Sequence, residues 1–294
     1  MPGTVQAASS GAVGFDCDTK LTADSASAFA AAGFRFAIRY LTRDAPEAES
    51  DLTTQEALDI LGAGLALMAV QHVAPAGWVP SAGLGTEQGG YAAANAMLVG
   101  LPPGVSVWLD LEGVAAGTPS SDVAAYCNAW YAPVAEAGYV PGLYVGSGDI
   151  LDGDELFEDL AFTLFCQSGS DVPDVATYGY CMVQTIAGDV LDGVAYDSDV
   201  VQPDDLCALP FWLAPAPDSP VSFTIAPDPV VPGSPVTFTL SWEVADGAPF
   251  QILADDGPSG STYALPVPVS GSGSYVVTPK RLEVTYTLQL LSGQ

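Results

Sequence analysis

Basic residues are scarce in this chain. Its 294 residues include 6 Lys and Arg and a single His, against 35 Asp and Glu, so the formal net charge is −29. Because a phosphate backbone or an anionic lipid surface is bound through Lys and Arg, this composition argues against nucleic acid or an anionic membrane as a partner. A charge of this size keeps a protein soluble where salt screens self-repulsion, and a saline habitat is one explanation for it.

Long hydrophobic runs and closely spaced cysteines are also missing. No stretch approaches the roughly 18 apolar residues of a membrane-spanning helix, so membrane insertion is not expected. Residues 1–18 lack the basic region and the apolar core of an ordinary secretory signal. The five cysteines form no Cys-x-x-Cys pair, which argues against zinc, and we predict neither a metal nor a cofactor. Pairing of Cys166 with Cys181 in an oxidising compartment stays open.

The first two thirds of the chain alternate between short apolar runs and Ala-rich helical runs. The strand candidates are 12–18, 34–41, 65–73, 105–113, 139–146, 162–168, 180–186 and 194–201. The helix candidates are 22–32, 53–63, 87–99, 121–137 and 151–160. Eight strands alternating with helices predict a TIM-like (β/α)8 barrel, irregular in its last third, where the helices are short or missing. An open doubly wound sheet is the alternative topology.

The composition changes after Trp212. Pro-rich residues 214–222 predict a linker, and alternating runs follow at 236–244, 249–255, 273–279 and 282–291. They predict a small all-β, immunoglobulin-like sandwich over residues 223–294. The expected organisation is therefore an N-terminal arm at 1–11, the barrel at 12–213, the linker and the sandwich.

Two acids interrupt the apolar run Val-Trp-Leu-Asp-Leu-Glu-Gly at 107–113. Asp110 and Glu112 are two residues apart, and side chains at that spacing on a strand point to the same face. Burying two carboxyl groups together is costly, so a pair at the end of a buried strand indicates general acid chemistry on a glycosidic bond. The alternative is an acidic strand end exposed to solvent, which the neighbouring Trp108 and Leu109 disfavour.

Polar residues recur at the C-terminal ends of the candidate strands, where a barrel of this kind carries its site. Besides Asp110 and Glu112, they include Asp16, Asp18, Arg39, His72, Tyr144, Gln184, Asp197 and Asp199. Carboxylates can handle protons and developing positive charge, aromatic faces can cover a sugar ring, and amides can bind hydroxyls. Two members have plain structural alternatives: an ion pair with a buried acid for Arg39, and a structural histidine for His72.

An ordered set of motifs resembles a known family. The motifs are GFDCD (14–18), AGFRFAIRYL (32–41), VWLDLEG (107–113), GYVPGLYVG (138–146), YGYCMVQ (178–184) and VAYDSDV (194–200). They resemble the glycoside-hydrolase-like domain of unknown function 1906, which is similar to the lysozyme-type muramidases of glycoside hydrolase family 25. The resemblance spans about residues 14–213 and implies a barrel with its site at the strand ends.

The resemblance also implies roles for the site residues. Glu112 would be the general acid and Asp110 would orient or stabilise the reacting sugar. Asp16 and Asp197 would complete the acidic ring. Tyr144 and Gln184 would contact the substrate. Asp18, Arg39 and Asp199 are further candidate substrate contacts because of their places at the strand ends, and not because of the resemblance. One departure is that the muramidases usually carry Trp-Gln near strand six or seven, where this chain has Cys166-Gln167 and Val183-Gln184.

Two classes of function follow. The first is a glycoside hydrolase acting on peptidoglycan-type cell-wall glycans. The second is a non-catalytic glycan-binding or structural virion-surface or tail protein that keeps the hydrolase fold. Since no ordinary signal peptide is recognised, we expect an extracellular or virion-associated protein that leaves the cell by another route, such as phage lysis. The C-terminal sandwich would then be a candidate contact for virion proteins.

Overall fold

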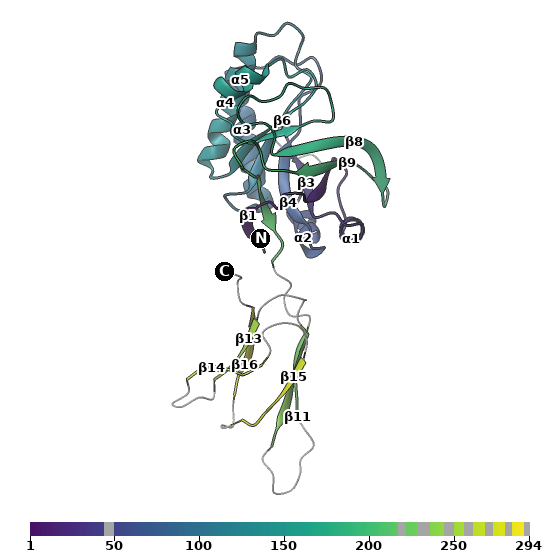
Figure 1. Ribbon diagram of the computed structural model, residues 1–294, viewed down its shortest axis with the longest axis vertical. Coiled ribbons are helices and arrows are strands. Elements are labelled where there is room, and N and C mark those ends of the chain that lie inside the picture. Colours follow the sequence, from purple (N-terminus) through teal and green to yellow (C-terminus); the bar gives the residue numbers. More distant parts are fainter. Residues whose placement is uncertain are drawn as a thin grey trace. The chain divides into compact units, whose positions relative to one another are not determined.

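The computed structural model describes residues 1–43, 50–216, 222–227, 236–243, 250–255, 261–267, 273–279 and 284–290. The chain divides into two compact units, Met1–Pro215 and Ala216–Gln294 (Figure 1). Within the described ranges, no helix combines the length and the apolar character that a membrane crossing requires.

The first unit contains ten strands and five helices in the described part of the chain. The strands are β1 (Thr4–Ala7), β2 (Val13–Cys17), β3 (Phe36–Leu41), β4 (Ala66–Gln71), β5 (Ser106–Leu111), β6 (Val140–Val145), β7 (Phe165–Gln167), β8 (Met182–Leu191), β9 (Val194–Val201) and β10 (Phe211–Ala214). The helices are α1 (Ala23–Ala31), α2 (Thr54–Gly62), α3 (Ala82–Val99), α4 (Ser120–Glu136) and α5 (Gly153–Glu158).

Eight of these strands close into a barrel. Their order around the ring is β4-β3-β2-β9-β8-β7-β6-β5, and the pairing of β5 with β4 completes the circle. The eight ring strands are the eight that the sequence predicts, so the closed barrel is confirmed. The alternative of an open doubly wound sheet is wrong, because an open sheet would leave β4 and β5 unpaired with each other.

The last ring strand departs from a regular (β/α)8 barrel. Strands β2 to β8 run parallel, whereas β9 runs antiparallel to both of its neighbours, β8 and β2. The tight turn between β8 and β9 explains the reversal: Asp192 and Gly193 have φ values of 51° and 80°, the pattern of a two-residue hairpin turn. A hairpin therefore replaces the last crossover helix, and it extends well beyond the barrel (Figure 1).

Two strands lie outside the ring. β1 pairs antiparallel with β10, which in turn pairs with β4. Residues 1–11, expected to form an arm ahead of the barrel, therefore contribute a strand to its sheet. Neither strand was predicted from the sequence, because both are only four residues long.

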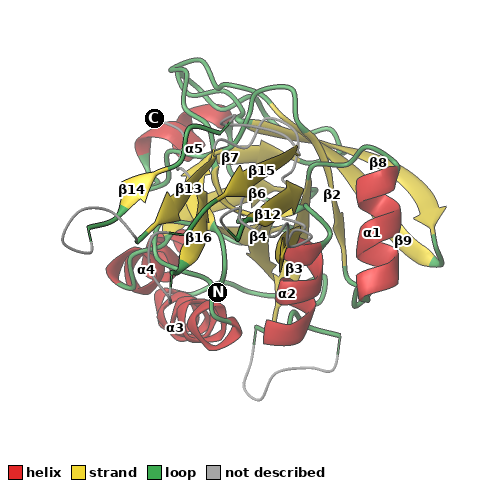
Figure 2. Cartoon of the chain, turned by 90° about the horizontal axis from the view of Figure 1, so that it is seen from below, coloured by secondary structure: helices red, strands yellow, loops and turns green. Residues whose placement is uncertain are grey.

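The helices cover the outside of the barrel (Figure 2). Side chains of Thr22, Thr53 and Ser81 accept hydrogen bonds from backbone N–H groups in the first turns of α1, α2 and α3, which fixes where these helices begin. Gly100, with φ of 96°, ends α3 in the left-handed conformation. One apolar cluster fills the layer between the helices and the strands.

A second apolar cluster fills the inside of the barrel. Two of its large members, Phe36 and Trp108, are accommodated because the strand beside each one carries a glycine. Gly14 lies opposite Phe36, and Gly142 lies opposite Trp108. A methyl group at either glycine would overlap the neighbouring ring. Each glycine thus makes room for the large ring beside it inside the barrel.

The second unit contains two three-stranded antiparallel sheets, in the orders β11-β12-β15 and β14-β13-β16. The strands are β11 (Ser222–Pro227), β12 (Phe238–Glu243), β13 (Phe250–Ala254), β14 (Tyr263–Ala264), β15 (Gly273–Val277) and β16 (Tyr286–Leu290). Residues from both sheets, among them Trp242 on β12 and Phe250 on β13, share one buried apolar cluster.

The interior packing predicts opposite effects for two Gly→Ala substitutions. Gly142→Ala forces the new methyl group against the Trp108 ring and is expected to lower the free energy of unfolding by roughly 1–3 kcal/mol. Gly90→Ala, within α3 and facing open space, removes backbone freedom from a helix and is expected to raise it by up to about 1 kcal/mol. Urea denaturation measures both changes; a neutral Gly142→Ala would contradict the packing described here.

Candidate functional site

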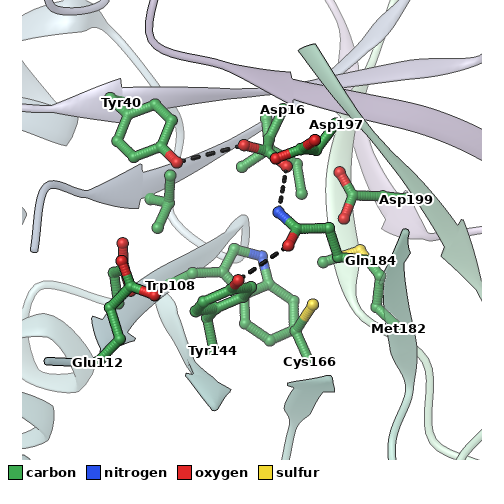
Figure 3. A pocket seen from close by; sticks show the side chains of 13 residues that line it. Asp16, Tyr40, Trp108, Glu112, Tyr144, Cys166, Met182, Gln184, Asp197 and Asp199 are labelled. Carbon is green, nitrogen blue, oxygen red and sulfur yellow. Dashed lines mark hydrogen bonds between the residues drawn. The ribbon is translucent and has the colours of Figure 1, made fainter. Parts of the chain in front are cut away.

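A cavity of about 240 Å³ lies inside the barrel, at the C-terminal ends of its parallel strands (Figure 3). Every ring strand contributes to its wall. The lining residues are Asp16, Ile38, Tyr40, Val70, Trp108, Asp110, Glu112, Tyr144, Cys166, Met182, Gln184, Asp197 and Asp199. The structure thus brings seven of the nine predicted site residues to one place, all except Asp18 and Arg39.

The antiparallel direction of β9 places Asp197 and Asp199. Asp197 lies opposite Asp16 in the β2–β9 register, and Asp199 lies opposite Gly14 on one side and Gln184 on the other. The two acids were expected as the end of a parallel strand. They reach the cavity because β9 enters the ring from the C-terminal rim and runs antiparallel to its neighbours. Residues in its middle therefore lie beside Asp16 of β2 and Gln184 of β8.

A chain of hydrogen bonds fixes Asp16. Tyr40 donates its hydroxyl to Asp16 Oδ1 at 3.2 Å, and Gln184 donates Nε2 to Asp16 Oδ2 at 2.7 Å (Figure 3). The Tyr144 hydroxyl donates to Gln184 Oε1 at 2.8 Å, which orients the amide. Both Asp16 oxygens are therefore held by donors from β3 and β8, and the carboxyl group is fixed before any ligand arrives.

Burial raises the pKa of several acids of the cavity. It raises the pKa of Asp16 to about 6; the Gln184 hydrogen bond opposes this shift and the charge of Asp197 adds to it. Burial also raises the pKa of Asp110 and Asp199 well above the usual value. The charges of Glu112 and Asp16 add to the shift at Asp110, and the charge of Asp16 adds to it at Asp199. The cavity can therefore hold protons near neutral pH.

Glu112 is the half-buried member of the acid pair and follows the last residue of β5. Its pKa is raised by burial. Two contacts position it: Trp78 Nε1 donates to its backbone oxygen at 2.8 Å, and Gly146 leaves room where a methyl group would meet the Glu112 side chain. Glu112 is thus both protonatable and reachable from the cavity.

Three buried polar atoms of the cavity have no hydrogen-bond partner among the described residues. They are Trp108 Nε1, Asp110 Oδ1 and Asp199 Oδ2. Each such atom costs roughly 1–3 kcal/mol unless something satisfies it. A ligand rich in hydroxyl groups supplies both the donors and the acceptors that these atoms lack. Sequence reasoning used Trp108 only as a sign of burial and missed its place in the cavity wall.

Arg39 does not line the cavity. On β3 it faces away from the barrel interior, where its Nε lies 2.6 Å from Oε1 of Glu56 on α2, and both side chains are fully buried. It also donates to the backbone oxygens of Cys17 and Ser50. The predicted substrate contact is replaced by the structural alternative, an ion pair with a buried acid. Tyr40, the next residue of β3, points to the opposite face and lines the cavity together with Ile38.

Two wider cavities adjoin the central one. A cavity of about 380 Å³ shares Asp16, Tyr40 and Asp197 with it and is also lined by the exposed Asp18. A cavity of about 420 Å³ on another side shares Glu112. Asp18 therefore lies beside the central cavity and not within it.

The described residues include no cluster of three His, Cys, Asp or Glu side chains that could hold a metal ion. The five cysteines are unpaired, with Cys166 in the cavity wall.

The closed barrel and the acid-lined cavity at its strand ends define a glycoside-hydrolase-like protein. The chain belongs to the Rv2525c-like, glycoside hydrolase-like domain family, whose profile matches residues 27–190. No curated protein matches it in sequence.

Solved structures are similar to this chain at low sequence identity. The Tat-secreted protein Rv2525c of Mycobacterium tuberculosis, crystallised with L-tartrate, is 19% identical over 66% of this chain and 96% of its own, with a TM-score of 0.50. A bacterial lysozyme from Streptomyces coelicolor is 17% identical over 66% of this chain and 93% of its own, with a TM-score of 0.46. The catalytic domain of a Listeria monocytogenes phage endolysin is 12% identical over 66% and 95%, with a TM-score of 0.47.

The Arg39–Glu56 pair predicts a stability effect that does not involve the cavity. Arg39→Met leaves Glu56 charged and unpaired in a buried layer, so the free energy of unfolding is expected to fall by about 3–5 kcal/mol. Adding Glu56→Gln, which removes the charge but can still accept from the Leu21 N–H, should recover most of the loss. Denaturant unfolding of the wild type, of Arg39→Met and of the double variant measures both changes. The exposed Arg35→Gln is the control, and a loss below about 1 kcal/mol for Arg39→Met would refute the assignment.

The raised pKa of Asp16 predicts a pH-dependent stability. Its folded-state pKa of about 6 lies above the roughly 3.9 of a solvated aspartate side chain. The folded state therefore binds the proton more tightly, and the wild type loses stability as pH rises through this window. Asp16→Asn cannot ionise. Its melting temperature relative to the wild type should therefore rise between pH 4 and pH 7 and then level off. A constant or opposite difference, measured by calorimetry, would show that Asp16 is not desolvated.

Proposed function

We propose that the barrel is a glycoside hydrolase acting on peptidoglycan-type cell-wall glycans, with Glu112 as the general acid. The observation that carries this proposal is the pairing of a reachable, half-buried Glu112 with the fully buried Asp110 in one cavity, where burial raises the pKa of both. A protonated Glu112 can deliver its proton to the glycosidic oxygen as the bond to the leaving sugar breaks.

The remaining acids face the reacting sugar from β2 and β9. Asp16 and Asp197 lie opposite each other in adjacent strands, across the cavity from the β5 acids. Carboxylates there would stabilise the positive charge that develops on the sugar ring. Asp110, beneath Glu112, would orient the sugar. Tyr144 and Gln184 would contact its hydroxyl groups, as would the unpaired atoms of Trp108 and Asp199.

The size of the cavities favours an extended glycan. The central cavity, at about 240 Å³, is smaller than the roughly 300–1,000 Å³ typical of sites for drug-sized ligands, and it fits a single sugar unit. The two wider cavities that adjoin it would extend the cleft on either side of the cleaved bond. Because such a cleft accepts a chain that passes through it, a polymer of sugars is the substrate class we propose.

We also propose that the protein acts outside the cell that makes it, since a wall glycan is reached from there. Rv2525c, whose fold it shares, is a Tat-secreted protein. The second unit would be an immunoglobulin-like attachment module over residues 223–294, after a linker at 214–222; its two antiparallel sheets with a shared apolar cluster support this part of the proposal. Action on a virion or in phage lysis stays a prediction from the sequence.

One observation favours a second candidate, a non-catalytic glycan-binding or structural protein. Of the two positions where the muramidases usually carry a tryptophan, Cys166 lines the cavity and Val183 is not among the lining residues. A missing stacking surface weakens the hold on a sugar in the distorted geometry that cleavage requires. Such a protein would bind wall glycan through the same cavity and leave it intact.

Glu112→Gln tests the proposal. The change removes the acidic proton of Glu112 and keeps the shape of its side chain. It should lower the release of reducing ends from purified cell walls by at least 100-fold and leave the melting temperature within a few degrees of the wild type. Glu87→Gln, the same change on the exposed face of α3, is the matched control and should be fully active.

Full turnover by Glu112→Gln would contradict the role of Glu112. A wild type that sediments with walls but releases no reducing ends would establish the binding protein instead of the hydrolase.

A further inference from the structure

The central cavity holds more acids than the hydrolysis of a glycosidic bond requires. Two carboxyl groups suffice for that reaction, one as the acid and one as the nucleophile or base. The cavity has five, and among the described residues that line it there is no Lys, Arg or His. Asp199 takes no part in the proton transfer proposed above, yet it is 1% exposed. Because buried acids are costly without a compensating charge, this surplus points to a bound group that carries positive charge.

Asp199 lies deeper in the barrel than Asp197. It follows Asp197 by two residues on β9 and lies opposite Gly14 of β2, two residues before Asp16. Asp16, Asp197 and Asp199 form one group in the cavity wall (Figure 3). Burial raises the pKa of Asp199 well above its usual value, and the charge of Asp16 and a hydrogen bond with Asp16 add to the shift. Without a cation beside it, Asp199 therefore holds the proton that it shares with Asp16.

The donors of the cavity wall leave two carboxyl oxygens unsatisfied. Tyr40 and Gln184 both donate to Asp16. Asp199 Oδ2 and Asp110 Oδ1 are buried and have no hydrogen-bond partner among the described residues. A ligand has to bring donors to these atoms, and a hydroxyl group brings one. An ammonium group brings three, together with the positive charge that the wall lacks.

We propose that the sugar unit held in the central cavity carries a free amino group, whose ammonium form binds to Asp199 and Asp16. The positive charge favours the ionised form of Asp199, so the shared proton passes to the solvent as the ligand binds. Charge-assisted hydrogen bonds then replace the proton held between two acids. This inference rests on the proposed function and narrows its substrate to glycans in which at least one amino sugar lacks its N-acetyl group.

Three tetrasaccharides that differ only at carbon 2 of each sugar test the proposal. They are the β-1,4-linked tetramers of glucosamine, N-acetylglucosamine and glucose, here called the amino, acetyl and hydroxyl forms. Calorimetry uses the full chain carrying Glu112→Gln, which is expected to leave them uncut, in about 0.5 M salt, which screens attraction beyond roughly 4 Å. Near pH 6 we expect the amino form to bind at least about tenfold more tightly than either of the others.

Two variants separate the site from the negative charge of the whole chain. Asp199→Asn, added to Glu112→Gln, removes one charge from the cavity and should abolish most of the preference for the amino form. Asp171→Asn is the matched control, because Asp171 is exposed and lines none of the three cavities. It removes the same charge and should keep the full preference. The melting temperature of each variant shows whether the fold is kept.

The second measurement leaves the aspartates of the cavity unchanged. Binding of the amino form near pH 6 should release protons, because the ammonium group ionises the carboxyl that held the shared proton. Calorimetry in two buffers with different ionisation enthalpies counts these protons. Binding with no release of protons would contradict the proposal.

The outcomes distinguish the two proposals. If the acetyl or the hydroxyl form binds as tightly as the amino form, or if Asp199→Asn leaves the preference intact, the amino-sugar proposal is overturned and the hydrolase proposal stands. Preferential binding of the amino form by a wild type that releases no reducing ends from any glycan overturns the hydrolase proposal and keeps the amino-sugar site. Failure of the wild type to bind or cleave any of these glycans overturns both.

Discussion

Desolvation of carboxyl groups at the mouth of a closed barrel is the constraint on which the site depends. Asp16, Asp110 and Asp199 come from three strands that are far apart in the sequence, and all three side chains are buried in one cavity. Water cannot solvate their charges there, so the pKa of each is raised and protons stay bound where exposed acids would have lost them. Burying these acids lowers the stability of the fold near neutral pH. Such a loss is common at functional sites, where the arrangement that activity requires is not the most stable one.

The reversal of one strand completes the acidic ring. In a regular barrel, each parallel strand brings only its C-terminal residues to the rim. The eighth strand would also be parallel, because a crossover helix would connect it to the seventh. The hairpin at Asp192 and Gly193 instead sends β9 back through the ring, with two acids facing β2 and β8. The same hairpin leaves Gln184 of β8 beside Asp16, where it orients the carboxyl group. Local turn chemistry and site geometry are thus linked.

Much of this architecture could be predicted from the sequence, because apolar runs and helical periodicity mark all eight ring strands and the helices between them. Which face of a strand buried on both sides points into the barrel could not be predicted. Apolar residues lie on both sides of β3, so Arg39 and Tyr40, which both lie near its end, are equivalent candidates until the register with β2 is known. Arg39 was chosen as the substrate contact, and the structure places Tyr40 in the cavity instead. The direction of β9 was missed although Asp-Gly between alternating runs is a hairpin signal. The Trp108 nitrogen has no sequence signal, since only the three-dimensional packing leaves it unpaired.

The most direct test of this account is a carbon-detected NMR titration of the Asp and Glu side-chain carboxyl groups in the intact chain, assigned by single substitutions. The account predicts that Asp16 titrates near pH 6 and that Asp110, Asp199 and Glu112 also titrate above their ordinary range. If all four groups titrate near pH 4, as solvated carboxyls do, they do not share a desolvated cavity and the account is contradicted.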